Sequence, residues 1–248
     1  MENLVLKWRR PETIEFPKVW HTFKVRDMDT DKLVEYRIQD LPSDRTEEIL
    51  EHLVANFIQD APVLQAFEGA KDPNLIEDYK LMWRKMIDQN VSLVCFKEDS
   101  NEIVGANVLF VIKKDDEDFM QMCCRNHKSQ ITKDVSDLIL IVEKNFDVFN
   151  HYGINEYLTS YGLCVDRKFR GRNIGVHFLE TRKKLCKEYG LKLTHSTFSS
   201  TFSSKIADNV GFETNFAMKF EDIIKTHPRF GHLKNIKSSE IALKSLVC

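Results

Sequence analysis

The sequence of 248 residues lacks the features that mark several specialised classes of protein. Its six cysteines are scattered and include no Cys-x-x-Cys pair, so their spacing predicts neither a disulfide framework nor a zinc site. Cys123, Cys124 and His127 form a small cluster without a fourth ligand nearby, and we expect no metal. No apolar run approaches the roughly 20 residues that span a bilayer. The N-terminus also lacks the apolar core of a signal peptide, so we expect a cytoplasmic protein that does not enter membranes.

An excess of charge of either sign is missing as well. Lysine and arginine number 36 against 38 aspartates and glutamates, a net charge of −2. Binding to nucleic acid generally needs an excess or a concentrated stripe of positive charge, so we expect no nucleic-acid partner. The one notable basic cluster covers 167–172 and favours a local anion site.

What the sequence does contain is a mixture of strand and helix patterns without a repeat, a linker or a low-complexity tract. Strand patterns cover 34–41, a hairpin at 91–114, 156–165, 191–198 and a final strand at 211–223. Helical patterns cover 44 to about 60, 74–88, 134–152, 175–189 and 203–210, and 115–133 has the polarity of a loop. This order predicts one α+β domain with a mixed sheet.

The junction between the strand at 156–165 and the following helix carries the strongest functional signal. Backbone N–H groups at the start of a helix are unpaired and, with the helix dipole, bind phosphate oxygens. Gly171 and Gly175 allow the backbone to approach a ligand closely. Four basic side chains add positive charge to the same turn: Arg167, Lys168, Arg170 and Arg172. The alternative is a solvated basic turn before an ordinary helix.

The run Arg170-Gly171-Arg172-Asn173-Ile174-Gly175, between a strand and a helix, resembles the signature Arg/Gln-x-x-Gly-x-Gly/Ala of the GNAT superfamily of N-acetyltransferases. The order of elements and Gly211-Phe212 extend the resemblance over most of residues 25–223. It implies a single N-acetyltransferase domain over 1–248, with 224–248 as a C-terminal extension. The implied GNAT fold is α+β, with a mixed, mostly antiparallel central sheet that splays between the strands near 158–165 and 191–198 and is flanked by helices.

The same resemblance implies acetyl-CoA as co-substrate. It implies that the strand residues Leu163, Cys164 and Val165 contact the pantetheine arm. The residues implied to contact the pyrophosphate lie in the loop and at the start of the helix: Arg170, Gly171, Arg172, Asn173, Ile174, Gly175 and Val176. Asn173 stands where the signature has its first glycine. Because asparagine tolerates a left-handed backbone better than most residues, we predict that the loop still forms.

Three segments, at 82–108, 157–175 and 199–213, resemble the insect arylalkylamine N-acetyltransferase branch of the superfamily. This resemblance implies direct acetyl transfer to a small primary amine in a ternary complex, and we expect the enzyme to be a monomer. The chemistry needs a base that removes a proton from the ammonium group before the amine attacks the thioester.

The residues implied for catalysis depart from the family in one place. The family's base is the Glu of an Asp-Glu-Pro stretch, and the matching residues here are Asp60, Ala61 and Pro62, so Ala61 cannot transfer a proton. Asp60, another carboxylate or a water relay would have to replace it. Ser199 and Ser203 match the family's two serines, which implies hydroxyls near the thioester sulfur; the alternative is that Ser203 caps a helix.

Three alternatives stay open at this point. The chain is either an active enzyme, a CoA-binding sensor or scaffold that has lost catalysis, or a peptide or polyamine N-acetyltransferase. His195 on its apolar strand is either a hydrogen-bonded core residue or a group that titrates near neutral pH.

Overall fold

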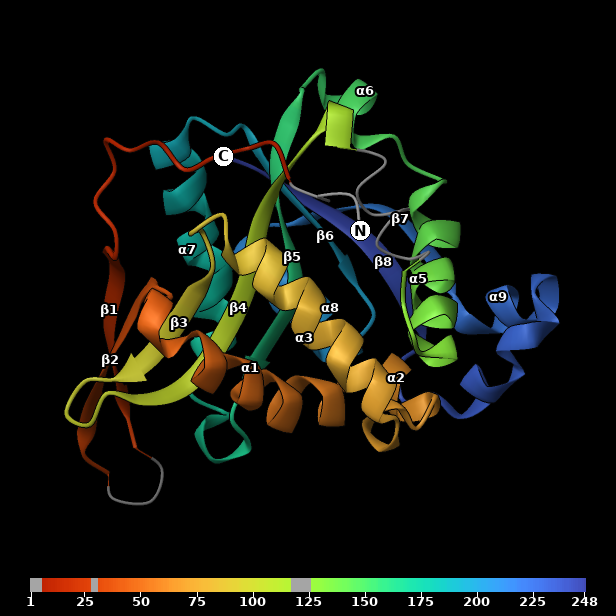
Figure 1. Ribbon diagram of the computed structural model, residues 1–248, viewed down its shortest axis with the longest axis horizontal. Helices are drawn as coiled ribbons and strands as arrows, with labels where there is room; N and C mark the ends of the chain where they lie inside the picture. Colours follow the sequence, from red (N-terminus) through yellow and green to blue (C-terminus); the bar gives the residue numbers. More distant parts are fainter. Residues whose placement is uncertain (1–5, 28–30, 117–125) are drawn as a thin grey trace.

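A computed structural model describes residues 6–27, 31–116 and 126–248. Its eight strands form one sheet in the order β1-β2-β3-β4-β5-β6-β8-β7 (Figure 1). Neighbouring strands pair antiparallel except β5 and β6, which are parallel. The strands are β1 Val19–Arg26, β2 Leu33–Asp40, β3 Leu93–Lys97, β4 Glu102–Lys113, β5 Glu156–Val165, β6 Leu193–Phe198, β7 Glu213–Lys219 and β8 Glu240–Val247.

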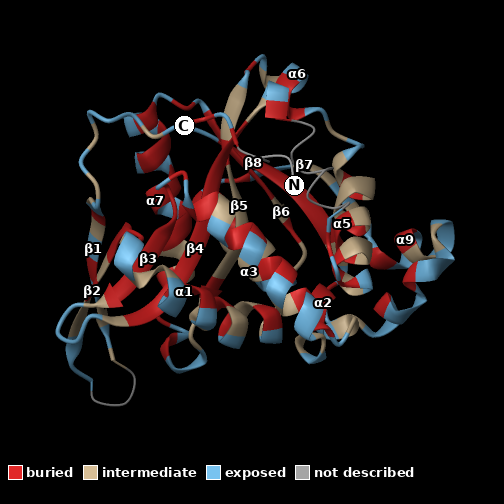
Figure 2. Ribbon diagram, in the orientation of Figure 1, coloured by how far each residue is buried: buried red, intermediate tan, exposed pale blue. Residues whose placement is uncertain are grey.

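Helices cover both faces of the sheet. The helices are α1 Thr46–Leu53, α2 Pro62–Ala66, α3 Pro73–Ile87, α5 Gln130–Glu143, α6 Val148–Tyr152, α7 Ile174–Tyr189, α8 Thr201–Val210 and α9 Phe220–Thr226. Apolar residues of α1, α3 and α5 share one core with the sheet, and those of α7 share a second core on its other face. Figure 2 shows that β3 and β4 are mostly buried, as are β6 and β8, whereas β5 is half-buried over most of its length. The predicted α+β architecture is confirmed.

Several elements lie where the sequence predicts them, because their patterns are local. The hairpin at 91–114 is β3 and β4, and the helix at 74–88 is α3. The helical pattern at 134–152 is interrupted, however. A new helix, α6, begins where the carboxylate of Asp147 accepts a hydrogen bond from the backbone N–H of Asn150.

Two strands were not anticipated by the sequence patterns. β1 is an edge strand whose two buried residues, Trp20 and Phe23, are three positions apart, so it lacks the alternation of apolar and polar residues that predicts a strand. The segment 211–223 is not the final strand, since β7 ends at Lys219 and α9 follows directly. Residues 240–247, expected to belong to an extension, form β8 between β6 and β7.

The sheet opens between β5 and β6, as expected for the implied fold. Within the described strands these two pair at one register, Leu158 opposite Thr194, whereas β6 and β8 pair over six successive residues. Beyond Leu158 and Thr194 the two strands diverge. The sheet is therefore splayed, which leaves backbone groups of β5 without a neighbouring strand.

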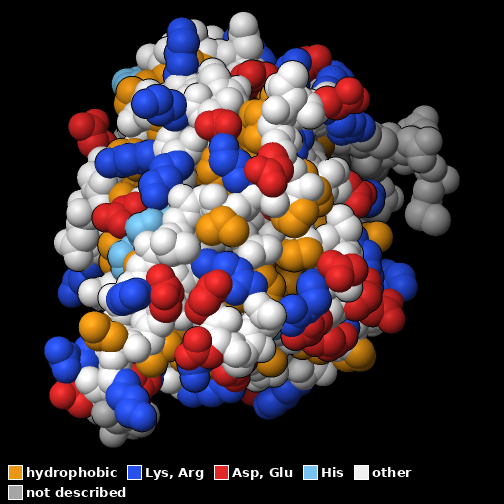
Figure 3. Space-filling view, turned by 90° about the vertical axis from the view of Figure 1, so that its left-hand side faces the viewer, with side chains coloured by type: hydrophobic (Ala, Val, Ile, Leu, Met, Phe, Trp, Pro, Cys, Tyr) orange, Lys and Arg blue, Asp and Glu red, His pale blue; other side chains and the backbone are white. Residues whose placement is uncertain are grey.

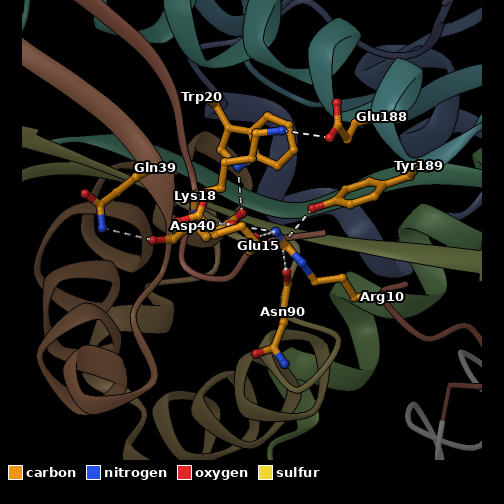
Figure 4. A network of polar contacts seen from close by, with 9 residues as sticks. All are labelled: Arg10, Glu15, Lys18, Trp20, Gln39, Asp40, Asn90, Glu188 and Tyr189. Atoms are coloured by element: carbon orange, nitrogen blue, oxygen red, sulfur yellow. Dashed lines mark hydrogen bonds and ion pairs between the residues drawn. The ribbon is translucent and has the colours of Figure 1, made fainter. Parts of the chain in front are cut away.

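The N-terminal segment is held by a buried ion pair (Figure 4). The carboxylate of Asp40, at the end of β2, accepts hydrogen bonds from Arg10 at 2.8 Å, from the indole of Trp20 at 2.7 Å and from the backbone N–H of Lys18 at 2.9 Å. Arg10 also donates to the hydroxyl of Tyr189 at the end of α7. Burial raises the pKa of the Asp40 carboxyl, and the bonds from Arg10 and Trp20 oppose that rise. This contact joins the chain before β1 to the end of α7.

Candidate functional site

The loop from β5 to α7 presents backbone N–H groups in the way that anion binding requires. Gly171 has φ of 80° and Asn173 has φ of 57°, and α7 begins at Ile174. The backbone N–H of His177 donates to the carbonyl of Asn173 at 3.1 Å, which is the first hydrogen bond of the helix. The N–H groups of residues 174–176 precede it and have no acceptor within the helix. They sit at the positive end of a 16-residue helix. Asn173 thus adopts the left-handed backbone that the sequence predicts for it.

The basic side chains of this loop are bound within the protein. Arg167 and Arg170 both form ion pairs with Asp60, and Lys168 pairs with Glu102. The Arg172 guanidinium is only 5% exposed; it donates to Asp27 at 3.0 Å and to the carbonyl of Lys168 at 2.7 Å. These side chains fix the shape of the loop, so the backbone is the part best placed to bind an anion.

Asp60 is poorly suited to act as a base. One of its oxygens accepts from Arg167, and the other accepts from Arg167 at 3.1 Å and from Arg170 at 2.5 Å. Although burial opposes it, the bonds from the two arginines lower the pKa of this carboxyl. A carboxylate held in this way has little tendency to take a proton near neutral pH. The structure instead gives Asp60 the role of joining the end of the first helical region to the loop before α7.

The strand that precedes the loop has one free edge. Leu163, Cys164 and Val165 pair with β4, while their other edge faces the opening beside β6. Successive residues of a strand direct their backbone groups to alternate edges, so some of these groups face the opening. Burial raises the pKa of the Cys164 thiol to about 12, so Cys164 remains protonated and packs as an apolar side chain.

Ser199 lies between β6 and α8 and Ser203 lies in the first turn of α8, and both are half-buried. α8 begins at Thr201 with Ser200 as its N-cap, so Ser203 is not the cap that the alternative interpretation placed there. The Ser203 hydroxyl lies in the first turn and donates to the carbonyl of Ser200 at 3.0 Å. Ser199 follows the end of β6. Both stay close to the diverging end of that strand.

His195 belongs to a buried hydrogen-bond chain. Its Nδ1 lies 2.8 Å from the hydroxyl of Ser245, which donates to Asn215 at 2.6 Å, and Asn215 donates to the hydroxyl of Tyr152. Because Ser245 uses its proton toward Asn215, it accepts from Nδ1–H of His195. Burial lowers the pKa of His195 to about 4, so the ring is neutral near pH 7 and does not titrate there.

Glu143 is a residue that the motifs did not indicate. It ends α5 and lines a narrow pocket together with Met82, His127, Ser136, Ile139, Leu140 and Tyr161. The hydroxyl of Thr197 on β6 donates to its carboxylate at 3.2 Å. Burial raises the pKa of Glu143 to about 7. A signal was present in the sequence, since this carboxylate directly follows the apolar run of residues 138–142.

A cluster of side chains of the types that bind metals lies on the face of the sheet that α7 covers. Ligand atoms of His21, His177 and Glu180 fall within 4.8 Å of one another, but the ammonium of Lys184 lies 3.2 Å from Nδ1 of His21. That positive charge would repel a metal ion. Cys123 and Cys124, of the cluster noted in the sequence, lie outside the described residues.

The charged side chains on the surface agree with the nearly balanced net charge of the sequence. Figure 3 shows one side of the molecule, on which basic and acidic side chains are interspersed. Among the described residues, no helix is long and apolar enough to cross a membrane.

Comparisons with known proteins place the chain among acetyltransferases. No family model matches it. A solved structure assigned provisionally as insect arylalkylamine N-acetyltransferase 7, from the mosquito Aedes aegypti, has a TM-score of 0.90 and 36% identity; the match covers 97% of this chain and 99% of the other. Arylalkylamine N-acetyltransferase 2 of Aedes aegypti has a TM-score of 0.76 at 17% identity, over 86% and 98%. A polyamine N-acetyltransferase of Drosophila melanogaster that forms N-acetylagmatine has a TM-score of 0.71 at 18% identity, and the match covers 86% of this chain and 100% of the other. The last two show the fold alone.

Proposed function

Because the chain belongs to the insect arylalkylamine N-acetyltransferase branch of the GNAT superfamily, we propose that it transfers the acetyl group of acetyl-CoA to a small primary amine. The observation that carries the proposal is the 36% identity over 97% of the chain. A splayed sheet and the N-terminus of α7, which follows the loop after β5, support it. Transfer is direct, in a ternary complex of both substrates.

Acetyl-CoA supplies an activated acetyl thioester, and the described residues fit it. The backbone N–H groups of Ile174, Gly175 and Val176 would bind the pyrophosphate at the start of α7, with Gly171 and Asn173 shaping the turn. The free edge of residues 163–165 would bind the amide groups of the pantetheine arm, as a further strand binds a sheet edge. Arg170 and Arg172 support this site by holding the loop.

The serines and Asp60 take different roles in this proposal. The hydroxyls of Ser199 and Ser203 lie where β6 ends and would return a proton to the sulfur of CoA. Asp60 does not accept the amine's proton; its ion pairs with Arg167 and Arg170 position the loop.

The remaining expectations fit this activity. We propose that the protein works in the cytoplasm as a monomer, without a metal or a nucleic-acid partner. Its described cysteines are free thiols, which suits a reducing compartment.

Two other functions have some support. A polyamine substrate is favoured by the relative that forms N-acetylagmatine, whose fold this chain shares. Binding of CoA without catalysis is favoured by Ala61, which replaces the expected base.

The test is a thiol-release assay with acetyl-CoA and a panel of arylalkylamines, polyamines and short peptides, run beside calorimetric titration of CoA. Turnover of a small amine would confirm the proposal, and the preferred amine would identify its class. Binding of CoA with no turnover of any compound would support a sensor instead. Absence of CoA binding would overturn both.

A further inference from the structure

The carboxylate of Glu143 lies at the point where the sheet opens. β5 and β6 pair at Leu158 and Thr194 and then separate. Three residues farther along each strand are Tyr161 and Thr197. Glu143 is hydrogen-bonded to Thr197 and shares a pocket with Tyr161, so α5 places its one glutamate across the diverging strands.

The pocket around this carboxylate has the composition of an amine site. Met82, Ile139 and Leu140 line it with apolar surface, while Ser136 and Tyr161 add hydroxyl groups. Glu143 as a whole residue is partly exposed, and it lines the pocket although its carboxyl is buried deeply enough to raise its pKa. Among the residues that the structure describes, no lysine or arginine forms an ion pair with Glu143; its recorded polar partner is the hydroxyl of Thr197. A buried carboxyl without a basic partner has a raised pKa, and a ligand that brings a positive charge would favour its ionised form.

We propose that this pocket receives the ammonium group of the amine substrate and that the Glu143 carboxylate accepts its proton. The inference rests on the proposed function, and it assigns the base that Ala61 cannot supply. The class of ligand is a primary alkylammonium ion, because a cavity of about 20 Å³ has room for its ammonium group.

The proton and electron balance is complete without another reactant. The carboxylate takes one of three protons from R–NH₃⁺ and leaves the neutral amine. The nitrogen lone pair forms the C–N bond to the acetyl carbon while the C–S bond breaks and its electron pair stays on sulfur. A second nitrogen proton passes to that sulfur and gives the CoA thiol. The protonated Glu143 releases its proton to solvent, so the net products are the acetamide, CoA and H⁺.

The acid–base properties of the site suit this role. A base works best when its pKa lies near the working pH, and burial raises that of Glu143 to about 7. The bond from Thr197 acts in the opposite direction. Other titratable groups line the pocket or lie on the elements packed against α5, namely His127, Tyr161, Asp78, Tyr79, His195 and Lys244. Burial lowers the pKa values of His127 and His195, so both are neutral near pH 7.

The test compares Glu143→Gln, which keeps the size of the side chain and an acceptor for Thr197, with the control Glu213→Gln on an exposed part of β7. We expect Glu143→Gln to lower kcat/KM for the best amine about 10²–10⁴-fold and to remove the acidic limb of its pH profile near 7. The Kd for CoA should stay within about twofold of that of the wild type. The second readout is calorimetric titration of the same amine into CoA-saturated protein, in which Glu143→Gln should raise Kd about tenfold or more.

Each outcome separates the two hypotheses. If the wild type turns over an amine and Glu143→Gln is equally active, the inference is overturned and the proposed function stands. If no amine is turned over but an amine binds in a Glu143-dependent way, the binding site stands and the function fails. If no amine is turned over or bound, both are overturned. An equal loss in Glu213→Gln would also overturn the assignment to Glu143.

Discussion

Asp60 accepts hydrogen bonds from Arg167, and the two residues are 107 positions apart in the chain. The contact joins the segment in which the family carries its base to the loop that leads into α7. Because Arg170 binds the same carboxylate, Asp60 neutralises part of the positive charge next to the proposed pyrophosphate site. The carboxylate beside Ala61 is therefore a structural anchor of the co-substrate loop.

Removal of this anchor's charge tests its role. Asp60→Asn keeps an acceptor oxygen for the arginines, so the loop should stay in place while a negative charge near the bound anion is removed. We therefore expect it to lower the Kd for CoA about two- to fivefold at low salt and to have little effect at high salt. The kcat for the best amine should change less than about threefold. Calorimetry and steady-state kinetics measure both, with Asp222→Asn on α9 as a control in a distant exposed pair. A hundredfold fall in kcat would show that Asp60 is the base after all.

Restoring the family's glutamate at position 61 is a separate test. Ala61 is half-buried and precedes α2, with extended backbone at φ −64° and ψ 120°. If Glu143 already takes the proton, Ala61→Glu should change kcat/KM for arylalkylamines less than about threefold. The measurement is thiol release with tryptamine and dopamine. A rise of about tenfold or more would indicate that the site still needs a carboxylate at 61, contrary to the role given to Glu143.

The conformation of Asn173 makes a prediction about the loop. Its φ of 57° suits glycine and asparagine but not a β-branched residue. We expect Asn173→Gly to keep both stability and CoA affinity. Asn173→Val should lower the free energy of unfolding by about 1–2 kcal/mol and weaken CoA binding more than Asn173→Gly does. Urea denaturation and calorimetry would measure these changes. Equal behaviour of the two variants would mean that the left-handed turn is not required for binding.

The sequence predicted the parts of this molecule that depend on local patterns. The hairpin of β3 and β4, helix α3 and the turn at Asn173 each follow from residues that are neighbours in the chain. The contact between Glu143 and Thr197 joins residues 54 positions apart, and it exists because α5 packs beside the separating strands. A motif search could not bring these residues together, since neither belongs to a motif.

The same limit explains the errors about individual side chains. The sequence predicts the four basic residues at 167–172 as a local cluster. It does not predict their ion-pair partners, because these lie on distant elements. A histidine side chain ordinarily titrates near neutral pH, so the sequence left this role open for His195. Its burial, which depends on distant elements, lowers its pKa to about 4. The sequence pattern does not predict β8, because its successive residues, Lys244 and Ser245 among them, are buried and do not alternate between apolar and polar.

The raised pKa of Glu143 also makes a prediction about stability that does not depend on catalysis. In the folded protein this pKa is about 7, against 4.5 for an ordinary glutamate in the unfolded chain. Between pH 4.5 and 7 the folded state therefore holds a proton that the unfolded state has lost. The contribution of Glu143 to stability is then fully present below pH 4.5 and is lost as the pH rises through 7, because ionisation of this carboxyl costs more in the folded protein.

Glu143→Gln removes that ionisation and should remove this decline. We expect the variant and the wild type to have similar free energies of unfolding near pH 5, and the variant to be more stable by about 2 kcal/mol at pH 8, a value reduced for the partial exposure of the residue. Urea denaturation at several pH values measures the difference, and Glu213→Gln should show no such trend. A difference that does not grow with pH would mean that Glu143 ionises as easily in the folded protein as in the unfolded chain. An enzyme that loses activity but gains stability at pH 8 through one substitution would instead show that the carboxylate is kept for its chemistry, since its charge costs the fold free energy.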